Sequence, residues 1–279
     1  MTPPTSGAVR PLVMGVVNVT PDSFSDGGSW FDPGEAIAHG RFLREQGADI
    51  LDVGGESTRP GAERPSPAEE SRRVLSVVGA LAEGGRVSID TMRAPIAAAA
   101  LDAGASIIND VSGGLADPEM AHLAAERGVP FVAMHWRGHS THMQDFARYD
   151  DVVVDVCREL TERVEALTAA GVRPADIVLD PGLGFAKLAR HNWQVLRHLD
   201  DVVALGHRVL LGASRKSFLG AVGRLPGSER SPLERDAATA VTTFHAAQHG
   251  VWAVRVHDVA ASIDALDVAA ALGGTDEGR

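Results

Sequence analysis

The sequence predicts a single (β/α)8 barrel, an α/β fold in which eight parallel strands alternate with helices and close into a cylinder. Its 279 residues are close to the roughly 250 that one such barrel needs. Short apolar, β-branched runs recur along the chain, separated by stretches rich in Ala, Leu, Arg and Glu. No linker rich in Pro, Gly or Ser divides the chain, so we expect one domain.

The apolar runs are the predicted strands. They span residues 12–17, 49–53, 86–89, 106–108, 131–134, 177–179, 208–211 and 252–256. Eight strands with helices between them favour a parallel sheet, and eight is the number that closes a barrel. An open doubly wound sheet is the alternative. No G-x-G-x-x-G follows the first run, so the nucleotide fingerprint of that alternative is missing.

Helix boundaries are predicted from capping residues. Three positions combine a capping side chain with a Pro next to it and a Glu three residues after it: Asp32, Ser66 and Ser231. Helices should stop near Gly47, Gly128 and Gly171. The amphipathic stretch 152–167 is a further predicted helix, in which Cys157 reads as a small buried apolar residue.

Composition limits the class of protein and its partners. Residues 1–10 and 273–279 are polar and aperiodic, so we expect tails on either side of a barrel over 11–272. The net charge is −11, which disfavours nucleic acid and anionic membranes as partners. The one cysteine cannot form an internal disulfide, and no secretory leader or long apolar run is visible. These features predict a cytoplasmic protein.

Polar residues follow every predicted strand. In chain order they are Asn18, 54–56, Asp90, 109–110, His135, Asp180, 214–216 and 255–257. A polar residue at one strand end is usually a turn former or a helix cap. In a closed barrel, however, the carboxyl ends of all strands meet at one face, where barrels of this type build their sites. We therefore predict the site at that face.

Two groups within this set suggest ligand chemistry. Asp90, Asn109 and Asp180 supply carboxylate and amide acceptors that suit a flat heterocycle with an amino-pyrimidinone edge. A cationic group suggests an anionic substrate part such as phosphate: Arg59, Lys216, Arg255 and His257. Ion pairs with neighbouring carboxylates are the alternative for each cation. A Schiff-base role for Lys216 is less favoured than phosphate or ring binding, because its neighbour Arg215 suits anion binding.

Three histidines, His135, His139 and His142, invite a zinc assignment. We do not adopt it. The string contains Gly138, follows a strand as a loop, and has no evident carboxylate or Cys partner in the sequence.

Several motifs, taken together, resemble the dihydropteroate synthases. They occupy residues 18–28, 52–61, 88–91, 108–114, 180–187, 214–216 and 255–258 in the order of that family. The resemblance runs from about residue 12 to residue 270, and the overall sequence looks actinobacterial. Residues 223–230 are a variable stretch to which nothing transfers. The resemblance implies the same (β/α)8 barrel.

It also implies a reaction: 7,8-dihydropterin-6-ylmethyl diphosphate is joined to 4-aminobenzoate, giving dihydropteroate and diphosphate for folate synthesis. Pterin-ring contacts are then implied for Asp90, Asn109, Asp180 and Lys216. Asn18 would sit beside Mg²⁺ and the diphosphate, whose oxygens would be surrounded by Thr58, Arg59, Arg255 and His257. The aminobenzoate pocket, which sulfonamides occupy in this family, would be outlined by Phe24, Pro60, Phe185 and Ser214.

The residue types agree with dissociative chemistry. Mg²⁺ and cationic side chains favour charge on the departing diphosphate, so the C–O bond can break first. An arylamine is neutral and needs no strong base. Catalytic contributions are expected from Asp26, closest to the pterin-methyl cation, and from Asp90, Lys216, Arg255 and His257. The family further implies a homodimer, with 236–247 as a suitable face.

Two other functions compete with this reading. Pterin-dependent methyltransferases share the Asp/Asn/Asp grip on the ring but need no diphosphate-binding group, so Asn18, Arg59, Arg255 and His257 favour the synthase. A non-catalytic paralogue should have lost residues of the first two loops, and none is missing here.

Overall fold

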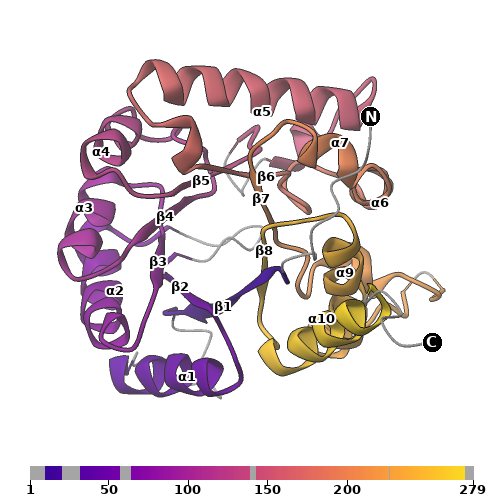
Figure 1. Cartoon of the computed structure of the whole chain (residues 1–279), viewed down its shortest axis with the longest axis horizontal. Helices are drawn as coiled ribbons and strands as arrows, with labels where there is room; N and C mark the ends of the chain where they lie inside the picture. Colours follow the sequence, from indigo (N-terminus) through magenta and orange to yellow (C-terminus); the bar gives the residue numbers. More distant parts are fainter. Residues whose placement is uncertain (1–9, 21–31, 57–63, 139–142, 226, 274–279) are drawn as a thin grey trace, which may run out of the picture.

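The computed structural model describes residues 10–20, 32–56, 64–138, 143–225 and 227–273. Over these residues the chain forms one closed barrel of eight parallel strands, in the order β1 to β8 (Figure 1). The barrel closes where β1 pairs with β8, with Leu12 opposite Ala253 and Gly15 opposite Val256. The predicted (β/α)8 class is therefore confirmed, and the open doubly wound alternative is wrong.

The strands lie at the predicted places. They are β1 Leu12–Asn18, β2 Ile50–Gly54, β3 Val87–Asp90, β4 Ile107–Asp110, β5 Phe131–Met134, β6 Ile177–Asp180, β7 Arg208–Leu211 and β8 Ala253–Val256. Five of them, β1 to β4 and β6, extend one or two residues beyond the predicted end. The extension takes in polar residues such as Asp90 and Asp180, which pair as strand residues and do not begin the following loop.

Helices surround the barrel in Figure 1. They are α1 Pro33–Glu45, α2 Pro67–Ala82, α3 Ala94–Asp102, α4 Glu119–Arg127, α5 Val152–Ala169, α6 Ala189–Arg197, α7 Leu199–Val203, α8 Ser217–Gly220, α9 Asp236–Gln248 and α10 Val259–Gly273. Short 3-10 turns occupy Met143–Phe146, Pro174–Asp176 and Leu233–Arg235.

Two of the three predicted helix starts are confirmed. The Asp32 carboxylate accepts from the backbone N–H of Gly34 at 2.7 Å, and Ser66 Oγ accepts from that of Glu69 at 3.2 Å. The start predicted at Ser231 is wrong, because a 3-10 turn intervenes and α9 begins at Asp236. The Glu234 side chain still accepts from the Ser231 N–H at 2.8 Å. Half of the capping box therefore forms on a turn that is too tight to continue as an α-helix.

Glycines end helices where predicted. Gly128 caps α4 in the left-handed conformation, with φ 60°, and its N–H donates to the Ala124 carbonyl. Gly47 and Gly171 follow the caps of α1 and α5 with φ of 104° and 99°. Within α5, Cys157 is only half-buried and packs against the edge of the core.

The core has two layers. The larger fills the space between the sheet and the helices. The smaller lies inside the barrel, where one apolar side chain from most strands forms a floor: Met14, Ile50, Ile107, Val132, Val178, Leu210 and Ala253. Burying these side chains is worth about 1.5–3 kcal/mol each for the larger ones. The floor closes one end of the barrel, so a site can open only at the other.

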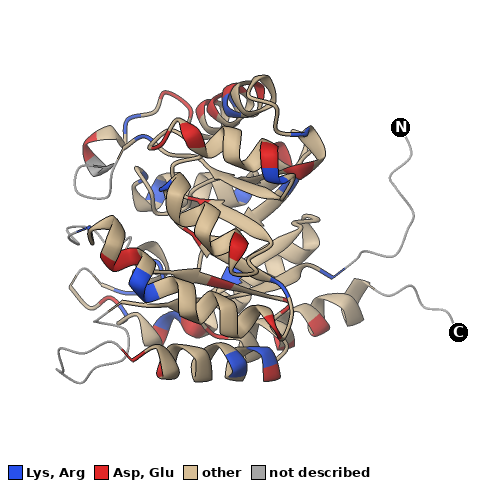
Figure 2. Cartoon of the chain, turned by 90° about the vertical axis from the view of Figure 1, so that its left-hand side faces the viewer, with Lys and Arg blue, Asp and Glu red and all other residues tan. Residues whose placement is uncertain are grey.

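The two predicted tails are described only in part. Arg10 pairs with Asp49 at 3.2 Å, and Gly273 is the last residue of α10; residues 1–9 and 274–279 lie outside the described part of the chain. Among the described residues, no helix is long and apolar enough to cross a membrane. In the view of Figure 2, basic and acidic residues of the described chain alternate along the helices.

Candidate active site

The polar residues of the site stand on the inner face of the barrel, one step above its apolar floor. Alternate residues of a strand point to the same face. Two residues beyond the floor, four strands carry polar side chains on that face: Asp52, Asn109, Asp180 and Arg255. In β3 the same step runs from the buried Ser88 to Asp90. The strand period thus places residues from five strands in one ring.

Arg255 of β8 is the centre of this ring. Its Nε donates to Asp52 Oδ2 at 2.6 Å, and its Nη2 donates to Asp90 Oδ2 at 2.8 Å. Asp52 is fully buried and also accepts from Asn109 Nδ2 at 2.9 Å. Because a carboxylate only accepts, Asn109 must turn its NH₂ toward Asp52. Its carbonyl oxygen is then left to accept from a ligand.

Asp90 has a strongly altered acidity. Burial raises the pKa of Asp90 to about 7, although the charge of Arg255 acts against this and the charge of Asp52 adds to it. Its carboxyl group therefore gains and loses its proton near neutral pH. A carboxylate that titrates there can change its hydrogen-bonding role with the state of a bound heterocycle.

Asp180 and Lys216 face each other across the ring. Burial raises the pKa of Asp180, against the positive charge of Lys216, and lowers the pKa of Lys216 to about 8, against the negative charge of Asp180. Asp180 Oδ1 accepts from the Gly182 N–H at 2.7 Å. Lys216 Nζ donates to the Leu183 carbonyl and lies 4.7 Å from the centre of the Phe185 ring. Carboxylate, ammonium and aromatic face thus meet at one place.

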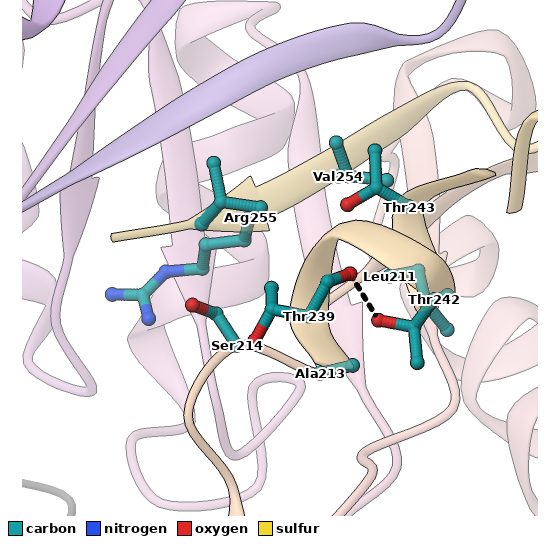
Figure 3. Close-up of a pocket in the computed structure, with 9 residues that line it drawn as sticks. Leu211, Ala213, Ser214, Thr239, Thr242, Thr243, Val254 and Arg255 are labelled. Carbon is teal, nitrogen blue, oxygen red and sulfur yellow. Dashed lines mark hydrogen bonds between the residues drawn. The ribbon is translucent and has the colours of Figure 1, made fainter. Parts of the chain in front are cut away.

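Ser214 and His257 form the next contact along the rim. Ser214 Oγ accepts from the His257 backbone N–H at 3.1 Å and lies 2.9 Å from its Nδ1. Figure 3 shows Ser214 among the residues that line a small pocket between β7, β8 and α9, with the Arg255 guanidinium pointing away from the threonines of α9. The Thr242 hydroxyl donates to the Thr239 carbonyl at 2.7 Å behind it.

Arg215 does not join the cationic group. Its guanidinium forms two hydrogen bonds, of 2.7 and 2.8 Å, with the Asp236 carboxylate at the start of α9. Its backbone takes a left-handed φ of 58°, which turns consecutive side chains Arg215 and Lys216 in different directions. The argument from Arg215 for an anion at Lys216 is therefore wrong, and Lys216 instead faces Asp180.

Asn18 is the candidate metal ligand. It is the last residue of β1, half-buried, and pairs with Gly54, which in turn pairs with Asp90. Its amide oxygen is a neutral, hard ligand of the kind that Mg²⁺ accepts beside phosphate oxygens and water. Among the described residues, no three His, Cys, Asp or Glu side chains are grouped as a metal site.

Several predicted site residues lie outside the described part of the chain: Phe24, Asp26, Thr58, Arg59 and Pro60. His139 and His142 also lie outside it. His135 is described and buried, with its Nε2 3.0 Å from Glu159 Oε2 and its Nδ1 2.9 Å from Lys187 Nζ. It therefore has the carboxylate partner that the sequence did not reveal, and that partner comes from α5.

Sequence reasoning missed Asp52 and the partners of Lys187. In the sequence, Asp52 is only one residue of the motif 52–61 and has no role of its own. In the structure it accepts from both Arg255 and Asn109 and so orients them. A detectable signal existed, because a charged residue inside an apolar β-branched run is rarely buried without a partner. Nothing in the sequence connects Lys187 with His135, which is 52 positions away.

Comparison with known proteins assigns the family. Residues 14–257 match the model of the pterin binding enzyme family. The chain is 54% identical over 262 residues to the dihydropteroate synthase of Mycobacterium leprae, covering 93% of this chain and 92% of that one. The structure of Xanthomonas albilineans dihydropteroate synthase with 4-aminobenzoic acid is similar at 44% identity and a TM-score of 0.88, over 95% of this chain and 94% of that one. A Yersinia pestis dihydropteroate synthase in a sulfonamide complex is similar at 38% identity and a TM-score of 0.87, over 94% of each chain. The chain therefore belongs to the pterin binding enzymes and, among them, to the dihydropteroate synthases.

Proposed function

We propose that the ring of polar residues above the barrel floor binds the pterin of the dihydropteroate synthase reaction. In that reaction the enzyme, a transferase, joins 7,8-dihydropterin-6-ylmethyl diphosphate to 4-aminobenzoate and releases diphosphate. The observation that carries the proposal is the convergence of Asp90, Asn109 and Asp180 on one inner face, with Lys216 beside Asp180.

The ring contacts follow from donor and acceptor types. The Asp180 carboxylate has Oδ2 left after its bond to Gly182 and can accept from the ring N–H and exocyclic NH₂ of a pterin. The Asn109 carbonyl oxygen is directed away from Asp52 and accepts from the same ligand. Lys216 supplies donors for the ring carbonyl or nitrogen. A flat, donor-rich heterocycle therefore satisfies groups that would otherwise be buried with unused acceptors.

Arg255 is proposed to act on the diphosphate as well as on Asp52 and Asp90. A guanidinium has five N–H donors. One from Nε and one from Nη2 are used by the two carboxylates, so three remain for phosphate oxygens. His257, on the same strand end, is proposed to bind the same group, together with Thr58 and Arg59.

Mg²⁺ fits this arrangement as an ion that arrives with the diphosphate. Asn18 would hold it through one amide oxygen, and when bound it supplies positive charge that stabilises the leaving diphosphate. The donor set suits this role, because one neutral ligand leaves most of the coordination sphere to phosphate oxygens and water.

The bond changes are a dissociative substitution. The C–O bond breaks with its electron pair going to the diphosphate, whose charge Arg255 and His257 stabilise. The resulting pterin-methyl cation is stabilised by the electron-rich ring and by carboxylates, with Asp26 the proposed nearest one. The neutral amine of 4-aminobenzoate then forms the C–N bond, and the resulting ammonium loses a proton to water. No strong base is needed for an arylamine, which agrees with the residue types present.

Phe185 and Ser214 are proposed to line the aminobenzoate pocket, with Phe24 and Pro60. Phe185 lies over Lys216, next to the pterin site, and Ser214 lies beside His257. The aromatic face packs on the arylamine ring, and the hydroxyl donates to its carboxylate. We also propose that sulfonamides, which mimic this substrate, bind here.

We further propose a cytoplasmic homodimer. Helices α9 and α10 pack on each other. Their outer surfaces expose three large apolar side chains, namely Val241, Val268 and Leu272. A pair of such faces provides the apolar contact that a symmetric dimer requires. Size measurement by light scattering tests this, and a monomer at micromolar concentration contradicts it.

Complementation tests the function. The gene should restore growth without folate products to a strain that lacks its own synthase, and an Asp180→Asn copy should not. The purified enzyme should form dihydropteroate, with release of diphosphate, when both substrates are present. Methyl transfer to a corrinoid protein without synthase activity would favour the methyltransferase alternative. Pterin binding with neither activity would favour a non-catalytic paralogue.

A further inference from the structure

The chain contains only two lysines, although it has 26 basic residues. The other 24 are arginines. Both lysines contact the loop between β6 and α6, residues 181–188: Lys216 donates to its Leu183 carbonyl, and Lys187 is part of it. Arginine presents a large planar fork, whereas lysine presents a compact ammonium with three donors. In a chain that uses arginine almost everywhere, two lysines at one loop indicate that this loop needs the smaller group.

Lys187 is buried, with 3% of its surface exposed, and its ammonium has a full set of acceptors. Nζ lies 2.9 Å from His135 Nδ1, 3.1 Å from the Gly182 carbonyl and 3.3 Å from the Phe185 carbonyl. His135 Nε2 faces the Glu159 carboxylate at 3.0 Å and must carry the proton there, because a carboxylate only accepts. Nδ1 is then an acceptor. Three donors thus meet three acceptors.

These bonds fix the loop that presents two other groups to the site. The Leu183 carbonyl accepts from Lys216, and the Phe185 ring lies 4.7 Å from the same ammonium. The loop backbone is not held by a helix or strand ladder here. Ala186 has a left-handed φ of 47°, and its carbonyl accepts from the Tyr149 hydroxyl at 2.9 Å. The Tyr149 hydroxyl thus binds the loop beyond Phe185, whereas the carbonyls on either side of Leu183, those of Gly182 and Phe185, accept from Lys187.

We propose that Lys187 is a positioning residue for this site: its ammonium holds the Gly182 and Phe185 carbonyls and so places the Leu183 carbonyl and the Phe185 ring against Lys216. The inference rests on the proposed role of Lys216 in pterin binding. Lys187 itself does not touch the substrate. Its role is to orient Lys216 toward the ring and Phe185 toward the amine.

The surroundings make the charge of Lys187 sensitive to pH. Burial lowers its pKa far below the ordinary value, with the charge of Asp180 acting in the opposite direction. The titratable and charged groups that face it come from several elements: His135 and Arg137 after β5, Glu159 of α5, Asp180 of β6, His191 of α6 and Lys216 after β7. As pH rises, loss of the proton removes one donor from a set of three, and one acceptor loses its bond.

The two lysines allow a direct test. Protein labelled with ¹³C at lysine Cε gives two side-chain resonances, which Lys187→Met assigns by removing one. Pterin-6-carboxylate is then added as a non-reactive probe, and its affinity is measured by calorimetry. In Lys187→Met we expect the free-state Lys216 resonance to move and the pterin affinity to fall at least 10-fold. The variant should also lose kcat, because Phe185 is displaced from the amine.

Tyr149→Phe is the matched control. It removes one hydrogen bond to the same loop, at Ala186, but leaves the three acceptors of Lys187 in place. We expect affinity within 2-fold of the wild type and an unchanged Lys216 resonance. Lys187→Arg should not rescue, because the fork does not match the three acceptors. Wild-type affinity in Lys187→Met, or equal losses in Lys187→Met and Tyr149→Phe, overturns the assignment.

The wild-type protein provides a second test that does not depend on a folded variant. Raising the pH should titrate the Lys187 resonance at about pH 7, and the Lys216 resonance should move through that midpoint as well as through its own at about pH 8. Pterin affinity should already change at the Lys187 midpoint. An affinity that stays constant through the Lys187 midpoint contradicts the proposal. If pterin does not move the Lys216 resonance in the wild type at any pH, the proposed ring contact fails instead, which separates the two failures.

Discussion

Arg255 and Asp52 lie 203 positions apart in the chain, yet Nε of the first is 2.6 Å from Oδ2 of the second. The same carboxylate oxygen accepts from Asn109 at 2.9 Å. One buried oxygen thus sets the orientation of a guanidinium proposed for the diphosphate and of an amide proposed for the pterin. Asp52 therefore links the residue proposed for the diphosphate with the residue proposed for the pterin.

Replacement of Asp52 by Asn should lower both stability and activity. The change removes a buried charge that pairs with Arg255 and leaves the guanidinium with Asp90 alone. Breaking a buried ion pair costs about 3 kcal/mol or more. We expect that loss in urea unfolding and a kcat/KM lower by at least about 100-fold. Asp102→Asn is the control, since Asp102 is exposed and pairs with Arg127 at the surface, where the cost is below about 1 kcal/mol. Equal losses in the two variants would mean that Asp52 is an ordinary surface-like partner.

Asp180→Asn should abolish useful pterin binding without unfolding the protein. An amide cannot accept two N–H bonds and presents a donor to a donor, which costs about 1–3 kcal/mol and more where charge is involved. Its remaining oxygen can still accept from Gly182. Calorimetry with a non-reactive pterin measures the loss. Asp176→Asn, just ahead of the same strand, removes a partner of Arg173 and should keep wild-type affinity. Unchanged affinity in Asp180→Asn would leave that residue only a turn former.

The pH profile of kcat/KM should be bell-shaped. Asp90 has a pKa raised to about 7, so the fraction of its carboxylate form, which accepts hydrogen bonds, increases as pH rises through that value. The pKa of Lys216 is lowered to about 8 and that of Lys187 to about 7, so each ammonium is lost as pH rises through its own value. We therefore expect a narrow maximum at about pH 7, followed by an alkaline limb that contains both lysines. The Lys216→Arg enzyme should have a lower kcat/KM. Its alkaline limb should lose the part due to residue 216, because arginine stays charged throughout this pH range. A flat wild-type profile between pH 6 and pH 9 contradicts these assignments.

The contribution of Asp90 to the free energy of unfolding should decrease as pH rises. Its folded pKa is raised above the unfolded value, so the folded state holds the proton more tightly. The contribution of Asp90 is then most favourable below the unfolded pKa, and it declines as pH rises from about 4 to about 7. Denaturation in urea at pH 5 and pH 8, compared between the wild type and Asp90→Asn, isolates this contribution. If the free energy of unfolding changes equally between pH 5 and pH 8 in both proteins, groups other than Asp90 cause the change.

Removal of Mg²⁺ should stop turnover and leave the fold intact. The site offers the single amide of Asn18, and the described residues contain no carboxylate cage that a structural ion needs. A chelator should therefore abolish diphosphate release while the melting temperature shifts by less than about 2 °C, which corresponds to a loss of at most about 1 kcal/mol for a chain of this size. A large loss of melting temperature in chelator identifies a structural metal instead.

Most of the fold was predictable because its signals are local. Each apolar, β-branched run predicts its own strand, and each cap such as Asp32 predicts the helix that follows it. Eight strands then predict a closed barrel. The exception at Ser231 has a local cause, because the capping side chain cannot specify whether the next turn is α or 3-10. Strand ends were set too short because polar residues resemble loop residues in a sequence.

The candidate site was predicted as a set of residues but not as a set of contacts. Asp90, Asn109 and Asp180 stood out as polar residues at strand ends. Arg255 donates to Asp52 and Asp90, and it can reach them only because β8 pairs with β1. The alternative of ion pairs with carboxylates, left open from the sequence, is therefore what the structure shows for Arg255. Such pairings join distant strands, and no local pattern contains them.

Closure of the barrel between β1 and β8 also sets the order in which the site is assembled during translation. Asp52 and Asp90 leave the ribosome 203 and 165 residues ahead of Arg255. Until the last strand emerges, these two carboxylates repel each other without a counter-charge, and no nascent intermediate can bury both of them cheaply. Arrival of β8 closes the cylinder and neutralises the pair in one event. One strand therefore completes the barrel, the charge balance of these carboxylates and the proposed site.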